Sequence, residues 1–294
     1  MVEIDREFLR PMLLARQNES SKRDYGHTLL VCGCSTMPGA AVLATGAALK
    51  SGCGLVTLHS TADACNAAVS QFPSAMISKD PCDCFSVVPD NLDRYGSIAV
   101  GPGLGKDHRT VEALKLLMEK AYGYGIPLIV DADAINIISQ HMELLPFARN
   151  AVFTPHAGEL ARLLGESCRS SGTTPDSITD RNRTNGKIKE LADTHGLTVV
   201  SKGYHSRIIS AGDDNIYECR TGNPGMAKGG SGDVLTGLLA GLVARGYEPA
   251  SAAKLAVWIH GFAGDILTAE CTAEAYNSRD LIDSLKYGFI SLSE

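Results

Sequence analysis

The residues with the clearest chemical potential lie in the stretch Gly222-Asn-Pro-Gly-Met-Ala-Lys-Gly-Gly-Ser-Gly-Asp233, which runs into an apolar segment with helical spacing. Its glycines can adopt left-handed conformations and present bare N–H groups, and a helix that begins there adds the positive end of its dipole. The stretch is therefore predicted to bind phosphate. A carboxylate repels such a ligand unless it handles a proton or a metal ion, so Asp233 is a candidate catalytic group. The alternative is that Asp233 only caps the helix.

Other chemically capable residues follow predicted strands. They are Gly101, Gly103 and Gly105 after residues 97–100, Asp131 and Asp133 after 127–130, His156 and Glu159 after 151–154, and Lys202, Gly203, His205 and Ser206 after 198–201. In sheets of parallel strands, ligands bind beyond the carboxyl ends of the strands. We therefore expect these strand ends and the glycine-rich stretch to meet at one crevice.

Several of these residues allow two interpretations. The G-x-G-x-G spacing of residues 101–105 disfavours a dinucleotide fingerprint, and leaves either an empty tight turn or a backbone wall for a flat ligand. On a continuing strand, Asp131 and Asp133 would share a face and repel unless one is hydrogen-bonded or pairs with a cation, such as Mg²⁺ in a phosphate complex. Asp133 could instead cap a helix that starts near residue 134. We assign both acids a supporting role.

Histidine and lysine candidates have simpler alternatives. His156 is either a ligand donor or a satisfied turn residue with Glu159 as a dipole partner. Lys202 either holds a nucleotide phosphate or ribose or is a solvated surface lysine. Trp258 and His260 lie on an apolar helical pattern and are expected to be packing elements, while Asp265 is expected to help fix a neighbouring loop.

The elements that must position these residues alternate along the chain. Strand patterns occupy residues 28–32, 55–59, 97–100, 127–130, 151–154, 198–201, 207–210 and 215–219, and helical patterns occupy 39–50, 110–122, 158–164, 183–195, 233–245 and 250–270. This rhythm predicts an α/β fold with a mainly parallel sheet covered by helices. Residues 167–180 are predicted to be an exposed connection, and residues 1–294 a single domain.

The composition excludes several classes of function. The net charge is −6 and the basic residues are scattered, so neither nucleic acid nor a membrane surface is an expected partner. No apolar run reaches membrane-spanning length and the charged start does not resemble a signal peptide, which predicts a cytoplasmic protein. Nine cysteines without a scaffold spacing are expected to be reduced thiols. The pairs Cys32/Cys34 and Cys82/Cys84 lack accompanying histidines, so a zinc site is disfavoured.

Seven blocks of the sequence together resemble one family, the ADP/ATP-dependent NAD(P)H-hydrate dehydratases. The blocks are Gly26-His-Thr-Leu-Leu-Val, Ala47-Ala-Leu-Lys-Ser-Gly-Cys-Gly-Leu-Val-Thr, Gly101-Pro-Gly-Leu-Gly, Val130-Asp-Ala-Asp-Ala-Ile-Asn, Thr154-Pro-His-Ala-Gly-Glu, Asn223-Pro-Gly-Met-Ala-Lys-Gly-Gly-Ser-Gly-Asp and His260-Gly-Phe-Ala-Gly-Asp. They occur in order over nearly the whole chain, and their joint occurrence is far more specific than any single glycine motif.

The resemblance implies a ribokinase-like fold and a hydro-lyase that repairs nicotinamide cofactors. Such an enzyme dehydrates the S form of NADHX or NADPHX, the hydrates of NADH and NADPH, and uses ADP or ATP with Mg²⁺ to give AMP or ADP and phosphate. A homotetramer is also implied. Many bacterial members carry an N-terminal epimerase domain, which this chain is expected to lack. The alternatives are a small-molecule kinase of the ribokinase or hydroxyethylthiazole-kinase type and a nucleotide-binding regulatory protein without turnover.

Matching motif positions implies roles for individual residues. Asp233 would accept the substrate proton; Ala40, Gly105, His156 and Asp233 would contact the hydrate; and Lys202, Gly203, Tyr204, His205, Ser206, Gly229, Gly230 and Gly232 would hold the nucleotide. No metal ligand is assigned. Two residues depart from the family pattern: Ala157 stands where many relatives have proline, and Lys228 often corresponds to a small polar residue. Lys228 could add phosphate affinity or face solvent.

Overall fold

The computed structural model describes residues 1–166 and 178–294. The exposed connection predicted at residues 167–180 lies outside these ranges, except for its last three residues, which open a helix. Within the described ranges, no helix is both long enough and apolar enough to cross a bilayer.

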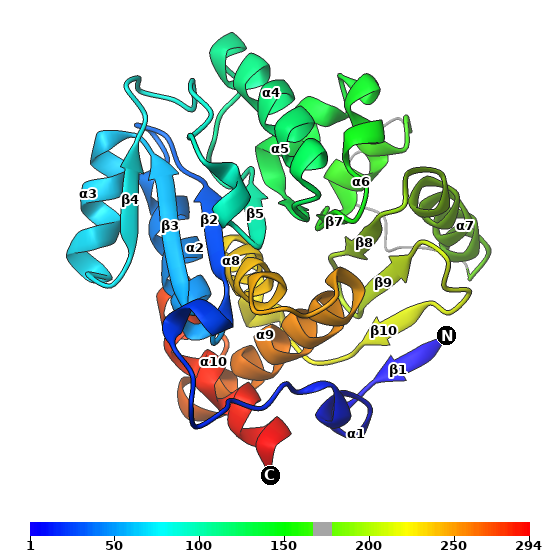
Figure 1. Cartoon of the computed structure of the whole chain (residues 1–294). Helices are drawn as coiled ribbons and strands as arrows, with labels where there is room; N and C mark the ends of the chain where they lie inside the picture. Colours follow the sequence, from blue (N-terminus) through cyan, green and yellow to red (C-terminus); the bar gives the residue numbers. More distant parts are fainter. Residues whose placement is uncertain (167–177) are drawn as a thin grey trace.

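A 10-stranded sheet forms the centre of the molecule, in the order β1-β10-β9-β8-β7-β6-β5-β2-β3-β4 (Figure 1). Neighbouring strands are parallel except that β9 runs antiparallel to both β8 and β10. The strands are β1 Val2–Ile4, β2 His27–Val31, β3 Leu55–Ser60, β4 Met76–Lys79, β5 Ser97–Val100, β6 Leu128–Val130, β7 Val152–Phe153, β8 Thr198–Ser201, β9 Ser206–Ser210 and β10 Tyr217–Cys219. The mainly parallel sheet predicted from the alternating pattern is confirmed.

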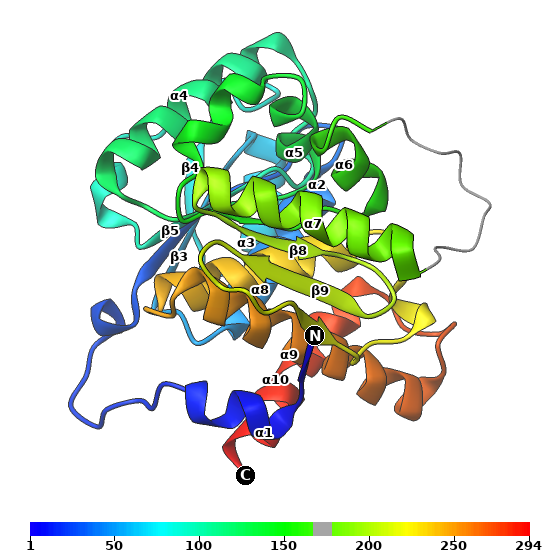
Figure 2. The ribbon, with the colours of Figure 1, turned by 90° about the vertical axis from the view of Figure 1, so that its right-hand side faces the viewer.

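Helices cover both faces of the sheet, as Figures 1 and 2 show. The helices are α1 Arg6–Leu9, α2 Pro38–Lys50, α3 Ala62–Gln71, α4 His108–Tyr124, α5 Ala132–Ile138, α6 Ala157–Leu163, α7 Ile178–His195, α8 Ser231–Ala244, α9 Pro249–Cys271 and α10 Ser278–Ser293. Short 3-10 turns occupy Arg10–Met12, Lys22–Tyr25, Leu92–Arg94, Met142–Phe147 and Pro224–Met226.

Successive residues of the central strands feed two hydrophobic cores. Leu30 and Ile129 pack in the core formed with α2, α3, α8, α9 and α10, whereas Leu29 and Leu128 pack in the core formed with α4, α5, α6 and α7. Because side chains alternate between the faces of a strand, strands with apolar residues on both faces require helices on both sides. This explains why the strand patterns are continuous apolar runs.

Glycines bring α8 directly against α2. A Cβ atom at Gly237 would lie 2.0 Å from the carbonyl oxygen of Ala44, and one at Gly241 would lie 1.9 Å from Ser51 Oγ. Only glycine fits at such distances. The two helices run in the same direction, so their N-terminal ends arrive together at the carboxyl edge of the sheet.

The predicted strands all overlap observed ones, with ends that differ by no more than two residues. The predicted helices are also present, although α7 begins at Ile178 rather than at residue 183. The sequence patterns missed β1, β4, α1, α3 and α10. Strand β1 shows why, because it is three residues long and pairs with β10, which lies more than 200 residues further along the chain.

Candidate active site

The carboxyl ends of β5, β6, β7 and β8 lie side by side in the sheet, and side chains that follow them make direct contacts. The Gly105 amide donates a hydrogen bond to Asp133 Oδ2 at 2.9 Å, and Lys202 Nζ donates to Asp131 Oδ1 at 2.7 Å. Helix α8 joins them, because Thr236 Oγ1 donates to Asp131 Oδ2 at 2.8 Å. The structure thus brings the expected strand ends and the helix after the glycine-rich stretch to one place.

Within the glycine-rich stretch, Gly230 is the residue that caps α8. Gly230 has a φ of +89°, a conformation that favours glycine, and a Cβ atom there would lie 2.3 Å from Leu43 Cδ1, so the leucine side chain would have to move. Gly229 has open space around its Cα, and its carbonyl accepts a hydrogen bond from Ser278 Oγ at 2.7 Å. The first amides of α8 are therefore presented without side-chain cover, as phosphate binding at a helix start requires.

Asp233 is the third residue of α8 and does not cap it. The cap position is Gly230, and no side-chain hydrogen bond closes this helix end. In the part of the chain that the structure describes, the Asp233 carboxylate forms no hydrogen bond or ion pair. Burial raises its pKa to about 6, the charge of Asp131 acts in the same direction, and Lys202 opposes both. Asp233 is therefore a part-buried carboxylate that is ionised near neutral pH and free to accept a proton.

Asp131 and Asp133 do not share a strand face, contrary to expectation. Strand β6 ends at Val130 and α5 begins at Ala132, so the two acids lie on either side of a sharp turn. Asp131 is buried, and both of its carboxylate oxygens accept hydrogen bonds from Lys202 and Thr236. Asp133 lies in the first turn of α5 and binds the Gly105 amide, so the alternative that it caps the helix is wrong.

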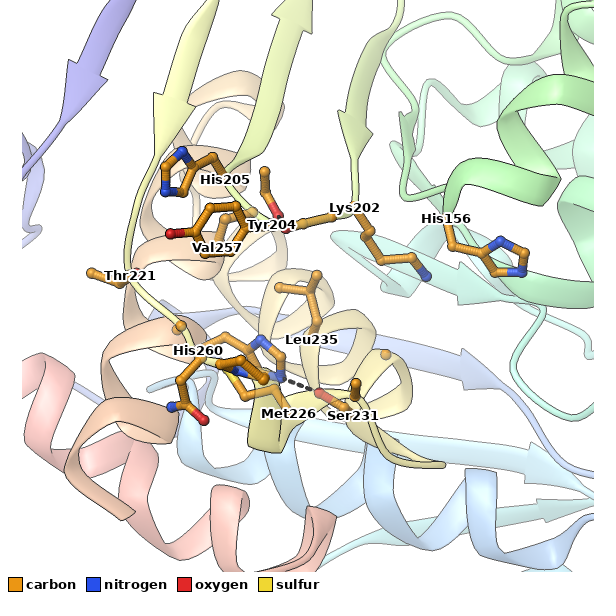
Figure 3. Close-up of a pocket in the computed structure, with 18 of the residues that line it drawn as sticks. His156, Lys202, Tyr204, His205, Thr221, Met226, Ser231, Leu235, Val257 and His260 are labelled. Atoms are coloured by element: carbon orange, nitrogen blue, oxygen red, sulfur yellow. Dashed lines mark hydrogen bonds between the residues drawn. The ribbon is translucent and has the colours of Figure 1, made fainter. Parts of the chain in front are cut away.

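A cavity of about 640 Å³ opens beside the first turn of α8 (Figure 3). Its apolar walls come from Met226, Leu235 and Val257, and its polar rim from the turn between β8 and β9. The lining residues are His156, Lys202, Gly203, Tyr204, His205, Ser206, Thr221, Gly222, Asn223, Pro224, Met226, Ala227, Lys228, Ser231, Gly232, Leu235, Val257, His260 and Gly261. The volume and the apolar walls suit a compact ligand with one flat group.

The other predicted site residues lie outside the lining of this cavity. Ala40 is in the first turn of α2, where a Cβ atom placed on Gly103 would lie 2.8 Å from the Ala40 side chain. Gly105 follows β5 and has a φ of +73°. The strand order places β8 and its cavity on one side of β6, and β5 and β2, which lead to Gly105 and Ala40, on the other. Asp131, which follows β6, and Asp233 therefore lie between two potential binding regions.

His156 is the N-cap residue of α6. Its Nδ1 accepts hydrogen bonds from the amides of Gly158 at 3.0 Å and Glu159 at 3.4 Å, while Glu159 Oε2 accepts one from the His156 amide. This is a reciprocal capping box, so the interpretation of His156 as a satisfied turn residue is correct for its Nδ1 atom. Because Nδ1 accepts, the proton of the neutral ring is on Nε2, which lies 3.3 Å from Glu159 Oε1. His156 is still among the residues that line the cavity, and it lies at the edge of this group (Figure 3).

Several residues of the cavity were not predicted as site residues from the sequence. His260 was expected only to pack, but it lines the cavity, and its Nε2 lies 3.4 Å from Ser231 Oγ (Figure 3). Burial lowers the pKa of His260 to about 4, so the ring is neutral at physiological pH. Asp265 fixes the loop as expected, because it accepts hydrogen bonds from the Gly222 amide and the Asn223 side chain. The Asn-Pro-Gly turn was the sequence signal that could have identified Asn223.

Lys228 borders the cavity, but its ammonium group is already paired with backbone carbonyls. Its Nζ donates hydrogen bonds to the carbonyl oxygens of Ala273 at 2.7 Å, Glu274 at 3.1 Å and Tyr276 at 2.6 Å. These carbonyls belong to the connection between α9 and α10. Lys228 therefore ties the glycine-rich loop to that connection, which is a structural role that neither sequence-based alternative included.

Metal ligands are sparse at this site. Considering only residues 1–166 and 178–294, no three His, Cys, Asp or Glu side chains are grouped so that they could hold a metal ion. Eight cysteines are free thiols, and Cys168 lies outside the described residues. Both carboxylate oxygens of Asp131 already accept hydrogen bonds. Most ligands of a divalent cation at this place would therefore have to be water molecules or oxygens of a bound phosphate.

The fold and the position of the site define a ribokinase-like protein. A hydroxyethylthiazole kinase from Pyrococcus horikoshii shares the fold with a TM-score of 0.61, at 16% identity over 90% of this chain and 89% of that one. Residues 28–286 match the family model described as NAD(P)H-hydrate dehydratase, so the chain belongs to this family. The resemblance of the seven sequence blocks is confirmed.

Individual relatives support the assignment. The ADP/ATP-dependent NAD(P)H-hydrate dehydratase from Bacillus subtilis, co-crystallised with ATP and Mg²⁺, has a TM-score of 0.81 at 27% identity, covering 99% of this chain and 98% of that one. The ADP-dependent (S)-NAD(P)H-hydrate dehydratase of Listeria monocytogenes is 31% identical over 86% of this chain and 84% of that protein. A bifunctional NAD(P)H-hydrate repair enzyme of Moorella thermoacetica is 35% identical over 97% of this chain, which spans about half (53%) of that relative's length.

Proposed function

We propose that this protein dehydrates the S form of NADHX and NADPHX to NADH and NADPH, with ADP or ATP as phosphoryl donor and AMP or ADP plus phosphate as products. The observation that carries the proposal is Asp233, a carboxylate at the glycine-capped start of α8 with a pKa raised to about 6 and with no hydrogen bond or ion pair among the described residues. A proton acceptor next to a phosphate-binding helix start is the arrangement that phosphoryl transfer to a hydroxyl group requires.

The proposed chemistry converts the C6 hydroxyl group, a poor leaving group, into a phosphate ester, from which phosphate leaves readily. Asp233 accepts the proton of the hydroxyl group on C6 of the hydrated ring while that oxygen attacks the terminal phosphorus, and the bond from phosphorus to the nucleotide breaks. The amides of Gly229, Gly230 and Gly232 stabilise the charge on the transferring group. The ring nitrogen then pushes its electron pair towards C6, the C6–O bond breaks and phosphate leaves. A proton then passes from C5 to the departing phosphate or to water, and the electrons of the C5–H bond form the C5–C6 double bond of the dihydronicotinamide.

The geometry supports separate places for the two substrates. The cavity lined by Lys202, residues 203–206 and Gly232 suits the adenine nucleotide, with Leu235 and Val257 against the base. The region of Ala40 and Gly105 is proposed for the hydrate. His156 lines the nucleotide cavity and is proposed to contact the hydrate where the two regions meet. Because Asp131 and Asp233 lie between these regions, a terminal phosphate from one side and a hydroxyl group from the other would meet at Asp233.

Mg²⁺ is proposed as the companion of the nucleotide, where it would neutralise phosphate charge. The donor set fits an ion that is held by phosphate oxygens and water rather than an ion in a protein cage. A single domain, a cytoplasmic location and a homotetramer remain predictions.

The decisive experiment incubates the protein with NADHX or NADPHX and with ADP or ATP. We expect recovery of the near-ultraviolet absorbance of the dihydronicotinamide ring, with release of phosphate in equal amount. Recovery should require the nucleotide, and comparison of ADP with ATP gives the preferred donor. Absence of recovery, together with a stable phosphorylated product from an alcohol or a vitamin precursor, would establish the kinase alternative instead.

Lys228→Met should weaken nucleotide binding with little effect on the chemical step. The methionine removes three hydrogen bonds that hold the glycine-rich loop on the connection between α9 and α10. We expect the KM for the nucleotide to rise about tenfold, as loss of roughly 1.4 kcal/mol of preorganisation would cause, and kcat to change less. Steady-state kinetics measures both.

Lys228→Arg is the matched control, because arginine keeps the charge and several donors and should retain most of the affinity. A fall in kcat with an unchanged KM for the nucleotide would show that Lys228 acts on the transferring phosphoryl group rather than on the loop.

A further inference from the structure

Asp131 is a buried carboxylate that has no task in the proposed reaction. Its side chain is 2% exposed and stands at the N-cap position of α5, yet it makes no capping hydrogen bond. Oδ1 accepts from Lys202 Nζ at 2.7 Å and Oδ2 accepts from Thr236 Oγ1 at 2.8 Å. Loss of one partner would leave an uncompensated buried charge, so the presence of this ion pair beside a reaction centre calls for an explanation.

The backbone around Asp131 fixes the direction of the carboxylate. The Asp131 amide donates to the Val100 carbonyl at 3.1 Å, and a Cβ atom at Gly101 would lie 1.8 Å from the Asp131 carbonyl oxygen. The next residue, Ala132, has a φ of +50°, a left-handed conformation that alanine seldom adopts. Strain of this kind persists where the surrounding structure enforces it, and it is concentrated at functional sites.

The first turn of α8 rests on the ion pair between Asp131 and Lys202. Thr236 lies three residues after Asp233 and therefore on the same side of the helix. At Gly232, a Cβ atom would lie 3.4 Å from Lys202 Nζ and 3.6 Å from Asp131 Oδ2. The catalytic carboxylate and the ion pair are thus parts of one packed unit.

Among residues 1–166 and 178–294, few titratable groups act on Asp233. From the end of β6 comes Asp131, from the end of β8 comes Lys202, and from the end of β2 comes Cys32, whose thiol stays neutral because burial raises its pKa. Lys202 is the cation of this set, and its ammonium group is committed to Asp131. If Asp131 lost its charge, the ammonium group would be left to pair with Asp233.

We propose that Asp131 is a positioning residue for the proposed dehydration: it holds the Lys202 ammonium group and the start of α8, and so keeps the Asp233 carboxylate free of a cation and available to the substrate hydroxyl group. This inference rests on the proposed function. It gives Lys202 two tasks, since the same ammonium group that borders the nucleotide cavity must be kept from Asp233.

The test compares Asp131→Asn with the double variant Asp131→Asn/Lys202→Met. Asparagine keeps the shape of the side chain and an acceptor for Thr236 but loses the charge. Carboxyl carbon NMR of ¹³C-aspartate-labelled protein should show that the pKa of Asp233 falls by about one pH unit or more in the single variant, because Lys202 then pairs with it. In the double variant, which lacks the cation, the pKa should return to that of the parent protein.

Kinetics supply the second readout. In the single variant, the acid limb of the pH profile of kcat should move to lower pH, and kcat on the plateau should fall by up to about 10²-fold, since the base is both weaker and displaced. Asp133→Asn removes a carboxylate two residues away that binds Gly105, and it should leave the acid limb where it is.

The outcomes separate the two claims. A parent protein that never turns over the hydrate would refute the proposed function, while the NMR titrations would still decide whether Asp131 governs Asp233. If the parent turns over the hydrate but Asp233 titrates identically in Asp131→Asn, or if the double variant does not restore its pKa, the positioning role is wrong.

Discussion

Asp233→Asn is expected to lower kcat for hydrate turnover by about 10²–10⁴-fold while nucleotide binding survives. Asparagine has nearly the same shape but cannot accept the hydroxyl proton, and no hydrogen bond in the described structure is lost with the carboxylate. Since the amides at the start of α8, which are proposed to bind phosphate, remain in place, the affinity for ADP or ATP measured by calorimetry should change little. Single-turnover measurements would assign the loss to the chemical step.

The parent protein provides a second sign of the same base. Because the pKa of Asp233 is raised to about 6, the ionised form that accepts a proton disappears as the pH falls through this value. The value of kcat/KM for the hydrate should therefore fall tenfold per pH unit below about pH 6. Asp214→Asn, at an exposed position between β9 and β10, is the matched control and should behave like the parent. Full turnover by Asp233→Asn would remove Asp233 from the mechanism.

The same Asp233→Asn variant is expected to be more stable than the parent at pH 8, by about 1–3 kcal/mol in the free energy of unfolding. A carboxyl group whose pKa is raised on folding favours the folded state when protonated, and this contribution is lost as the pH rises through about 6. Asparagine is neutral at every pH and avoids the cost of burying a charge beside Asp131. The difference should shrink as the pH is lowered and vanish below about pH 4, where the parent carboxyl group is protonated in both states.

Urea unfolding at several pH values measures this difference. The control Asp214→Asn should show no such pH-dependent gain, since its side chain is exposed. Equal or lower stability of Asp233→Asn at pH 8 would show that the buried charge of Asp233 is compensated in the folded protein. If both predictions hold, one carboxylate accounts for activity and for a local loss of stability, a trade that active sites commonly make.

Local sequence patterns predicted the elements that carry their own signal. The apolar runs of the inner strands and the helical spacing of α2, α4, α8 and α9 are properties of short segments, so their positions followed from the sequence. Strand β1 and helix α10 depend on distant partners instead, and β1 becomes a strand only because β10 lies beside it.

The site divides in the same way. The prediction that Asp233 is chemically active followed from the conflict between a carboxylate and a phosphate-binding loop, which is visible in adjacent residues. The ion pair between Lys202 and Asp131 joins residues 71 positions apart, and Lys228 binds carbonyls 45 to 48 positions away. Such contacts are set by the tertiary fold, so the sequence allowed only open alternatives for Lys202 and Lys228. His156 was closer to prediction, because the spacing of a capping box is local.

The contact between α2 and α8 sets the relative positions of the first turns of these two helices. The two helices approach most closely at Gly237 and Gly241, which follow Asp233 along α8, while the first turns of the two helices carry Ala40 and Asp233. A larger side chain at either glycine would push the two helices apart and move their first turns away from each other. We expect such a substitution to misalign the substrate before it causes an evident packing defect. Random mutagenesis should therefore find losses of activity at buried positions between α2 and α8 that do not contact a ligand.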